Sequence, residues 1–168
     1  MPPSVAIIVS RYNASITDAL VEGARAEYAA RSGAPESPPV YEAPGTYELP
    51  ILALAAAETG RYKGIVALGC LIRGETRHDR YIAESVAHGL MQVSLQTGVP
   101  VAFGVLTVES SKQARARSGG EKGNKGREAM AAVLDALASM DAIRRREPPP
   151  HPGRVAPASK PDKAGADA

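Results

Sequence analysis

Gly-Cys-Leu-Ile-Arg-Gly-Glu-Thr-Arg-His-Asp-Arg-Tyr occupies residues 69–81 and lies between two apolar patterns. The run before it, residues 65–68, is short and rich in β-branched side chains, which is typical of a buried parallel strand. Beyond it, apolar residues recur at helical spacing, at Ile82, Val86, Leu90 and Val93. We therefore expect a reactive loop at the carboxyl end of a strand, where open α/β sheets bind their ligands.

Strand and helix patterns alternate along the rest of the chain. Apolar runs predict four strands, at residues 4–10, 40–43, 64–68 and 101–106. Periodic patterns and stop signals predict helices at residues 15–32, 51–59, 82–97, 110–118 and 124–146. This alternation favours a parallel sheet with helices on both faces, within one domain.

Finer features of the helices can also be predicted. Ser15 and Asp18 fit a capping box at the start of the first helix. Residues 51–59 are so rich in Ala and Leu that we expect a well-buried helix. The glycine-rich residues 119–123 should form a flexible joint before the last helix. That helix should face the core with Met130, Val133, Leu137 and Met140.

The composition excludes several classes of protein. A chain of 168 residues, 44% of them hydrophobic, can bury a single sizeable core. The formal net charge of +2 and the absence of a basic stripe outside residues 144–146 give no indication of nucleic-acid binding. Cys70 is the only cysteine, so neither an internal disulfide nor a cysteine-based metal site is expected. With no long apolar segment and no leader pattern, we expect a cytoplasmic protein that does not enter the membrane.

The composition changes after residue 146. From residue 147 onward, six of the fourteen prolines occur among small and charged residues, and apolar periodicity is lost. We therefore expect one domain at residues 1–146 and a disordered, Pro-rich tail at residues 147–168.

The segments that follow the four strands should meet at one edge of the sheet and form one pocket. They carry aromatic rings, hydroxyls and a carboxylate, which suit a planar, hydroxyl-rich, anionic substrate. His78 is the sharpest candidate for chemistry, because imidazole can both accept and donate a proton near neutral pH. The alternative is a solvated loop histidine without a role.

Other residues have weaker signals. Arg73, Arg77, Arg80 and Arg117 could each hold a phosphate, and only Arg117 lies beside a glycine-rich segment and a lysine, Lys125. Cys70, at the end of an apolar strand, is expected to be a small buried hydrophobe rather than a nucleophile. No P-loop or Gly-x-Gly-x-x-Gly pattern follows a strand.

Five of these segments together resemble the lumazine synthase family, whose members catalyse the penultimate step of riboflavin biosynthesis. The resemblance covers residues 5–143. It rests on Arg-Tyr-Asn at 11–13, Pro-Gly-Thr-Tyr-Glu-Leu-Pro at 44–50, Ile-Arg-Gly-Glu-Thr-Arg-His at 72–78, Thr-Gly-Val-Pro-Val-Ala-Phe-Gly-Val-Leu-Thr at 97–107, and Gly-Asn-Lys-Gly at 123–126.

The resemblance implies a flavodoxin-like three-layer αβα sandwich with a four-stranded parallel sheet. It also implies the condensation of 5-amino-6-(D-ribitylamino)uracil with 3,4-dihydroxy-2-butanone 4-phosphate, which gives 6,7-dimethyl-8-ribityllumazine, phosphate and water. No cofactor and no metal are implied. The alternative is a non-catalytic lumazine- or flavin-binding paralogue with the same fold. It is suggested by Asp79-Arg80, where the family has an aromatic residue and then an acid.

Roles for single residues follow from the resemblance alone. His78 would transfer protons, and Tyr12 would stack on the pyrimidine ring. The ribityl chain would contact Thr46, Tyr47 and Glu48. The edge of the ring would contact the backbone of Cys70, Leu71 and Ile72. Phosphate would be bound by Thr76 and by the amide of Glu75. Phe103, Arg117 and Lys125 would come from a neighbouring subunit. A homo-oligomer with shared active sites is therefore implied, as a pentamer or a 60-subunit shell, with riboflavin synthase as a further partner.

Overall fold

The computed structural model describes residues 3–146, so the predicted tail at residues 147–168 lies outside the described residues. No helix in this part of the chain is both long and apolar enough to cross a membrane. The elements in chain order are β1 (Val5–Ser10), α1 (Ala14–Ser32), β2 (Val40–Ala43), the 3-10 helix η1 (Thr46–Glu48), α2 (Leu49–Glu58), β3 (Gly64–Ile72), α3 (His78–Thr97), β4 (Val101–Val108), α4 (Ser111–Arg117), β5 (Ser118–Gly120), β6 (Gly123–Asn124) and α5 (Lys125–Arg145).

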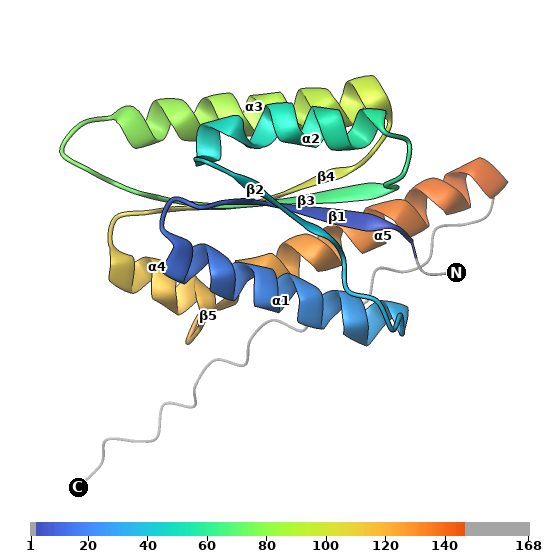
Figure 1. The fold of residues 1–168 in the computed structure, drawn as a ribbon, viewed down its shortest axis with the longest axis horizontal. Helices are drawn as coiled ribbons and strands as arrows, with labels where there is room; N and C mark the ends of the chain where they lie inside the picture. Colours follow the sequence, from blue (N-terminus) through green and yellow to red (C-terminus); the bar gives the residue numbers. More distant parts are fainter. Residues whose placement is uncertain (1–2, 147–168) are drawn as a thin grey trace, which may run out of the picture.

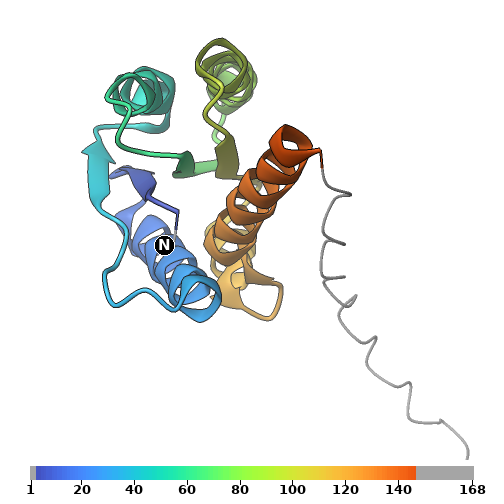
Figure 2. The same cartoon turned by 90° about the vertical axis from the view of Figure 1, so that its right-hand side faces the viewer.

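The main sheet has four parallel strands in the order β2-β1-β3-β4. Helices α2 and α3 cover one face of it, and α1, α4 and α5 cover the other (Figures 1 and 2). This arrangement confirms the predicted three-layer, flavodoxin-like sandwich. The carboxyl ends of the strands consequently lie at one edge of the sheet.

The core has two halves, one on each face of the sheet. Alternate residues of β3 enter different halves, because successive side chains of a strand point to opposite faces. Val66, Leu68 and Cys70 pack toward α1 and α5, whereas Ile65 and Ala67 pack toward α2 and α3. A strand that is buried on both faces must be apolar throughout, and this explains the continuous apolar run in the sequence.

The third strand is longer than predicted. Its pairing with β4 continues from Ile65↔Val101 to Ile72↔Val108, so Cys70 to Ile72 belong to the strand and not to a loop. The following helix starts at His78, four residues before its first apolar residue. The segment between strand and helix is therefore limited to residues 73–77.

The predicted capping box is wrong. Helix α1 starts at Ala14 after Asn13, and no side chain caps it. Asp18 is instead used by Arg11, whose guanidinium donates to its carboxylate over 2.6 Å. A charged partner at the end of β1 thus competes successfully with the free amides of the helix.

Two other predictions need correction. The glycine-rich joint forms a small antiparallel hairpin of β5 and β6. Helix α2 starts at Leu49, after η1, and Ile51 is 62% exposed, so this helix is less buried than its composition suggested. In the last helix, Met130, Val133 and Leu137 are buried as predicted, whereas Met140 is half-buried.

Helices α1 and α5 touch at Gly126. A Cβ atom at this position would collide with the backbone carbonyl oxygen of Leu20. Asn124, just before α5, strengthens the contact by donating from Nδ2 to the carbonyl of Ala19 over 2.8 Å. The same side chain accepts from the amides of Gly126 and Arg127, so it caps α5 as well.

Gly126→Ala should therefore destabilise the protein by roughly 2–3 kcal/mol, although alanine normally favours a helix, because a backbone oxygen cannot rotate away from the added methyl. Urea unfolding at a fixed protein concentration measures this. Gly74→Ala is the control, since an added Cβ there has no neighbour within 4 Å. Equal stability of the two variants would contradict the close approach of the helices.

Candidate active site

A cavity of about 780 Å³ opens at the carboxyl edge of the sheet. Its walls come from the segments that follow β1 and β2, from the end of β3 and from the first turns of α3. The segment after β4 does not contribute, so three of the four predicted strand ends meet. The lining residues are Tyr12, Asn13, Gly45, Thr46, Tyr47, Glu48, Cys70, Leu71, Ile72, Gly74, Thr76, His78, Asp79, Tyr81, Ile82 and Ser85.

Thr46 lines this cavity and has a buried, unpaired hydroxyl. The residue is only 4% exposed, and its Oγ1 has no hydrogen-bond partner within the described part of the chain. Space for it exists because residue 69 is glycine: a Cβ there would lie 3.0 Å from the hydroxyl oxygen. Buried hydroxyls are normally paired, so Thr46 is a polar group of the cavity wall that lacks its usual partner.

Glu48 is also available to a ligand. It directly precedes α2, where a carboxylate could cap the helix, but its side chain makes no capping hydrogen bond. Its neighbour Tyr47 and the more distant Tyr12 are 62% and 68% exposed. Two aromatic rings and a free acceptor thus border the cavity, as the composition of these segments suggested.

His78 lies at the cavity wall as the first residue of α3, and not within a loop. Its side chain is exposed. Ile82 and Ser85 follow it on the same helix, four and seven residues later, and line the cavity too. The histidine therefore stands on a rigid element at the mouth of the cavity.

The residues after His78 have different environments. Asp79 is half-buried and lines the cavity. Arg80 is directed along the helix, where its Nε donates to Glu84 over 2.7 Å, and this pairing raises the pKa of the guanidinium. The acid of this pair, and not the arginine, thus borders the cavity.

Asn13 is a lining residue that sequence reasoning did not single out. Its backbone is in the left-handed region, with φ 61° and ψ 46°, and its Nδ2 donates to the carbonyl of Cys70 over 2.9 Å. Asparagine is enriched at positive φ, but the sequence does not reveal which asparagine adopts it. Tyr81, Ile82 and Ser85 were also missed, although their helical spacing from His78 could have indicated them.

Four predicted site residues do not line the cavity in this chain. Phe103 is 42% exposed on β4, one of the two edge strands, and Glu75 is exposed between Gly74 and Thr76. Arg117 donates to the carbonyl of Gln113 over 3.3 Å, and Lys125 pairs with Glu128. Among the other arginines, Arg73 pairs with Glu109 at 3.4 Å.

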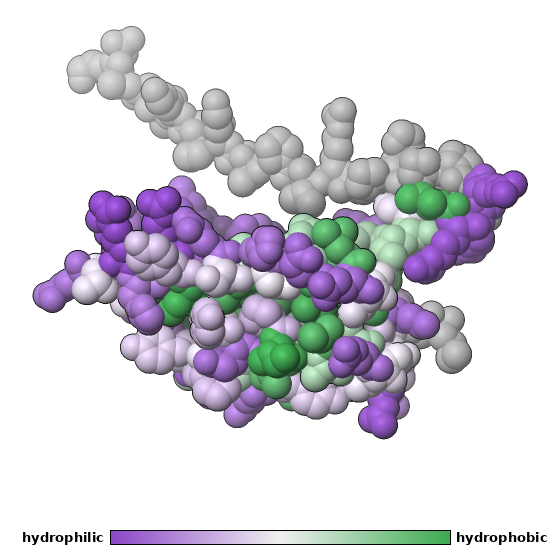
Figure 3. Space-filling view, turned by 90° about the horizontal axis from the view of Figure 1, so that it is seen from above, coloured by the Kyte–Doolittle hydropathy of each residue, from purple (hydrophilic) through white to green (hydrophobic). Residues whose placement is uncertain are grey.

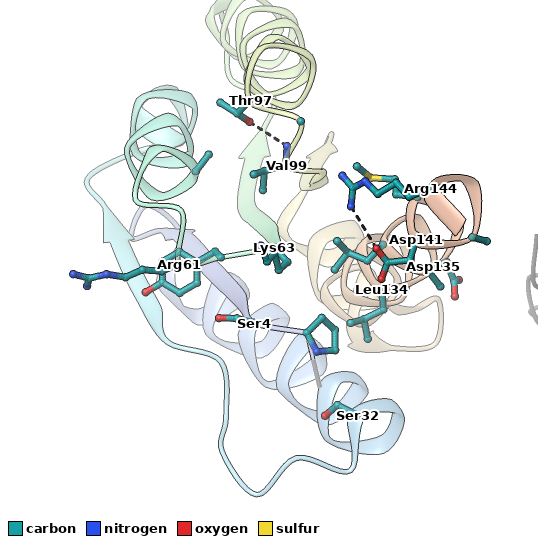
Figure 4. Close-up of a pocket in the computed structure, with 18 of the residues that line it drawn as sticks. Ser4, Ser32, Arg61, Lys63, Thr97, Val99, Leu134, Asp135, Asp141 and Arg144 are labelled. Carbon is teal, nitrogen blue, oxygen red and sulfur yellow. Dashed lines mark hydrogen bonds and ion pairs between the residues drawn. The ribbon is translucent and has the colours of Figure 1, made fainter. Parts of the chain in front are cut away.

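A second, larger cavity of about 1310 Å³ lies at the opposite edge of the sheet (Figure 4). Two of the arginines in its wall are paired with carboxylates, Arg31 with Asp135 at 2.7 Å and Arg144 with Asp141 at 3.4 Å, and no histidine lines it. No cluster of three metal-ligating side chains occurs anywhere in residues 3–146. The carboxyl-edge cavity is therefore the better candidate for chemistry.

The carboxyl-edge cavity is typical of one class of protein, α/β sandwiches that bind small polar molecules at the carboxyl ends of parallel strands. Here a histidine, His78, lies in the cavity wall. A family model described as 6,7-dimethyl-8-ribityllumazine synthase matches residues 2–141. The chain is 46% identical to 6,7-dimethyl-8-ribityllumazine synthase 1 of Caulobacter vibrioides over 144 residues, which cover 86% of this chain and 94% of the relative. Two further relatives are named 6,7-dimethyl-8-ribityllumazine synthase. The one from Xanthomonas euvesicatoria is 49% identical, over 82% of this chain and 90% of the relative. The one from Xylella fastidiosa is 44% identical, over 82% of this chain and 89% of the relative. The chain belongs to the 6,7-dimethyl-8-ribityllumazine synthase family.

Cys70 should be unreactive in the folded protein. It is fully buried, and burial raises the pKa of its thiol to about 11, so only roughly one molecule in a thousand carries a thiolate at pH 8. We expect very slow reaction with a thiol-specific disulfide reagent at pH 8, with a rate that rises about tenfold per pH unit up to pH 10. The same protein unfolded in guanidinium is the control, and a native rate close to the unfolded one would contradict the burial.

Proposed function

We propose that this chain catalyses the reaction after which its family is named. It would condense 5-amino-6-(D-ribitylamino)uracil with 3,4-dihydroxy-2-butanone 4-phosphate to 6,7-dimethyl-8-ribityllumazine, phosphate and water, as a step of riboflavin biosynthesis. The observation that carries the proposal is the cavity at the carboxyl edge, where His78, Glu48 and Thr46 lie together in a chain matched by the family over residues 2–141.

The pyrimidine would lie against Tyr12, with its edge on the backbone of Cys70, Leu71 and Ile72. This placement is supported by the position of both segments in the cavity wall. The ribityl chain would extend toward η1, where Thr46 has an unpaired hydroxyl and Glu48 a carboxylate that caps no helix. Tyr47 would complete this part of the site.

Phosphate would bind in the short segment between β3 and α3. Thr76 lines the cavity there, and the amide of Glu75 is next to it in the chain. This segment also leads into the first turn of α3, where free backbone amides favour an anion. His78 begins that helix, so the proton-transfer residue would sit beside the leaving phosphate.

Imine formation, phosphate elimination and ring closure each require a proton to move. One imidazole at the mouth of the cavity can serve in several of these steps, because it exchanges protons near neutral pH. A large part of the rate would come from holding two reactants together, and rigid strands and a helix suit that task.

The site would be completed by a second copy of the chain. Phe103, Arg117 and Lys125 would come from the neighbouring protomer, with Arg117 on the phosphate. Exposed apolar side chains support an assembly: Ile51 on α2 and Met91 and Leu95 on α3 are 62%, 59% and 72% exposed. Figure 3, a view from the side of α2 and α3, shows apolar residues at the surface among polar ones. A pentamer is the smallest assembly we propose, and a 60-subunit shell is the larger form.

Riboflavin synthase, which would use the product, is proposed as a partner, and the cytoplasm as the location. The non-catalytic alternative was suggested by Asp79-Arg80. Because Arg80 is paired with Glu84 outside the cavity, this part of the structure gives the alternative no support.

His78→Ala should lower turnover about tenfold or more, since the proton transfers would lose their group. Formation of the lumazine is followed by its absorbance and fluorescence with both substrates saturating. His88→Ala is a matched control, because His88 is exposed on the same helix and does not line the cavity; its turnover should stay within about twofold of wild type. A wild-type protein that forms no product would refute the proposal.

Arg117→Ala should raise the apparent constant for the phosphorylated substrate more than that for the pyrimidine, because one charge-assisted contact to phosphate is lost. Arg115→Ala, an exposed position on α4, serves as the control. Equal effects on both substrates would count against the assignment of Arg117.

Shared sites make a stronger test possible. The impaired His78→Ala and Arg117→Ala subunits are dissociated together, reassembled in equal amounts and assayed with the phosphorylated substrate well below its apparent constant for Arg117→Ala. About one quarter of head-to-tail interfaces should then pair an intact His78 with an intact Arg117. Activity should then return toward that fraction, while light scattering reports the assembly size. Reassembled particles of full size with no more activity than the mean of the two separate variants would contradict a site shared between subunits.

A further inference from the structure

The turn between β1 and α1 has a conformation that costs free energy. Asn13 is one of two non-glycine residues with positive φ in residues 3–146, and the left-handed region is unfavourable for residues with a Cβ. Its carbonyl accepts from the amides of Ile16 and Thr17 over 2.9 and 3.1 Å, so its backbone starts α1. Asparagine is a preferred N-cap, but this side chain makes no capping bond.

The side chain is used elsewhere, at the end of β3. Alternate residues of a strand direct their backbone groups to opposite neighbours. The amides of Ile65 and Arg73 donate to Pro100 and Val108 on the β4 side, so odd-numbered residues of β3 face β4. Cys70, an even-numbered residue, therefore directs its carbonyl toward β1.

Strand β1 is too short to pair with that carbonyl. The pairing between β1 and β3 ends at Val9↔Leu68, whereas β3 continues to Ile72. The side-chain amide of Asn13 donates to the Cys70 carbonyl instead, over 2.9 Å. Cys70 is fully buried, so the Asn13 side chain supplies a partner that a buried carbonyl needs.

We propose that Asn13 is a positioning residue. Its side-chain amide takes the place of a backbone hydrogen bond between β1 and β3, and it thereby sets the distance between two walls of the cavity. Tyr12, next to Asn13, forms one wall, and the backbone of Leu71 and Ile72 forms the other. In the proposed function one wall contacts the face of the pyrimidine and the other its edge, so the inference rests on that function. Asn13 should therefore affect binding of the planar pyrimidine, and not binding of the phosphorylated substrate.

Three variants separate the effect of the left-handed backbone at Asn13 from the effect of its hydrogen bond to the Cys70 carbonyl, here called the bridge. Asn13→Gly tolerates the left-handed backbone and loses the amide donor. Asn13→Asp keeps the shape of the side chain but places an acceptor against the Cys70 carbonyl. Asn13→Ala loses the bridge and also strains the turn, and because it is the variant at greatest risk of misfolding, the conclusion rests on the other two.

Binding of 5-amino-6-(D-ribitylamino)uracil is measured by calorimetry, together with KM for both substrates and kcat. We expect Asn13→Gly and Asn13→Asp to weaken pyrimidine binding about five- to tenfold and to leave KM for the phosphorylated substrate and kcat within about twofold. Labelling of Cys70 by the thiol reagent should accelerate in both, which reports loss of the bridge without any substrate.

Ser94→Ala is the matched control, since the Ser94 hydroxyl bridges α3 and β4 away from the cavity by accepting from the Val101 amide over 3.0 Å. We expect the melting temperature to fall in Ser94→Ala and in the Asn13 variants, because each loses one hydrogen bond. Pyrimidine binding should stay unchanged in Ser94→Ala. Unchanged binding in Asn13→Gly and Asn13→Asp, with a wild type that binds, would overturn the positioning role alone. A wild type that does not bind the pyrimidine would overturn the proposed function and the positioning role together.

Discussion

Strand β3 is buried on both faces and hydrogen-bonded on both sides, and the other elements are arranged around this constraint. Residues 64–71 are all buried, so their backbone groups must find partners within the protein. β1 and β4 supply most of them, and the two helical layers cover the side chains. Only at its carboxyl end, where β3 extends beyond the end of β1, does β3 lack a strand partner on one side. The cavity is located at this place.

The fold pairs some polar groups and leaves others without a partner. Arg11, Arg73 and Arg80 are held by carboxylates, and the carbonyl of Cys70 is held by Asn13. Thr46 and Glu48 have no such partner or cap at the cavity wall. This division separates residues that maintain the edge of the sheet from residues suited to substrate, and it is visible only when the hydrogen bonds are known.

The same division bears on the assembly. Phe103, Arg117 and Lys125 do not line the cavity of their own chain, and the site proposed here needs them from another copy. Apolar side chains exposed on α2 and α3 give that copy a surface to pack on. Catalysis and assembly would then depend on each other.

The sequence by itself determined the fold class, because continuous apolar runs that alternate with periodic segments are compatible with few arrangements other than a parallel sheet between two helical layers. It also indicated the segments at the strand ends, since the carboxyl ends of parallel strands must share an edge. It could not predict where β3 ends, which depends on pairing with β4, or that Asp18 binds Arg11 and caps no helix. The left-handed turn at Asn13 and its bond across 57 residues were decided by the tertiary structure, because a short β1 beside a longer β3 leaves a carbonyl that only a side chain from that turn reaches.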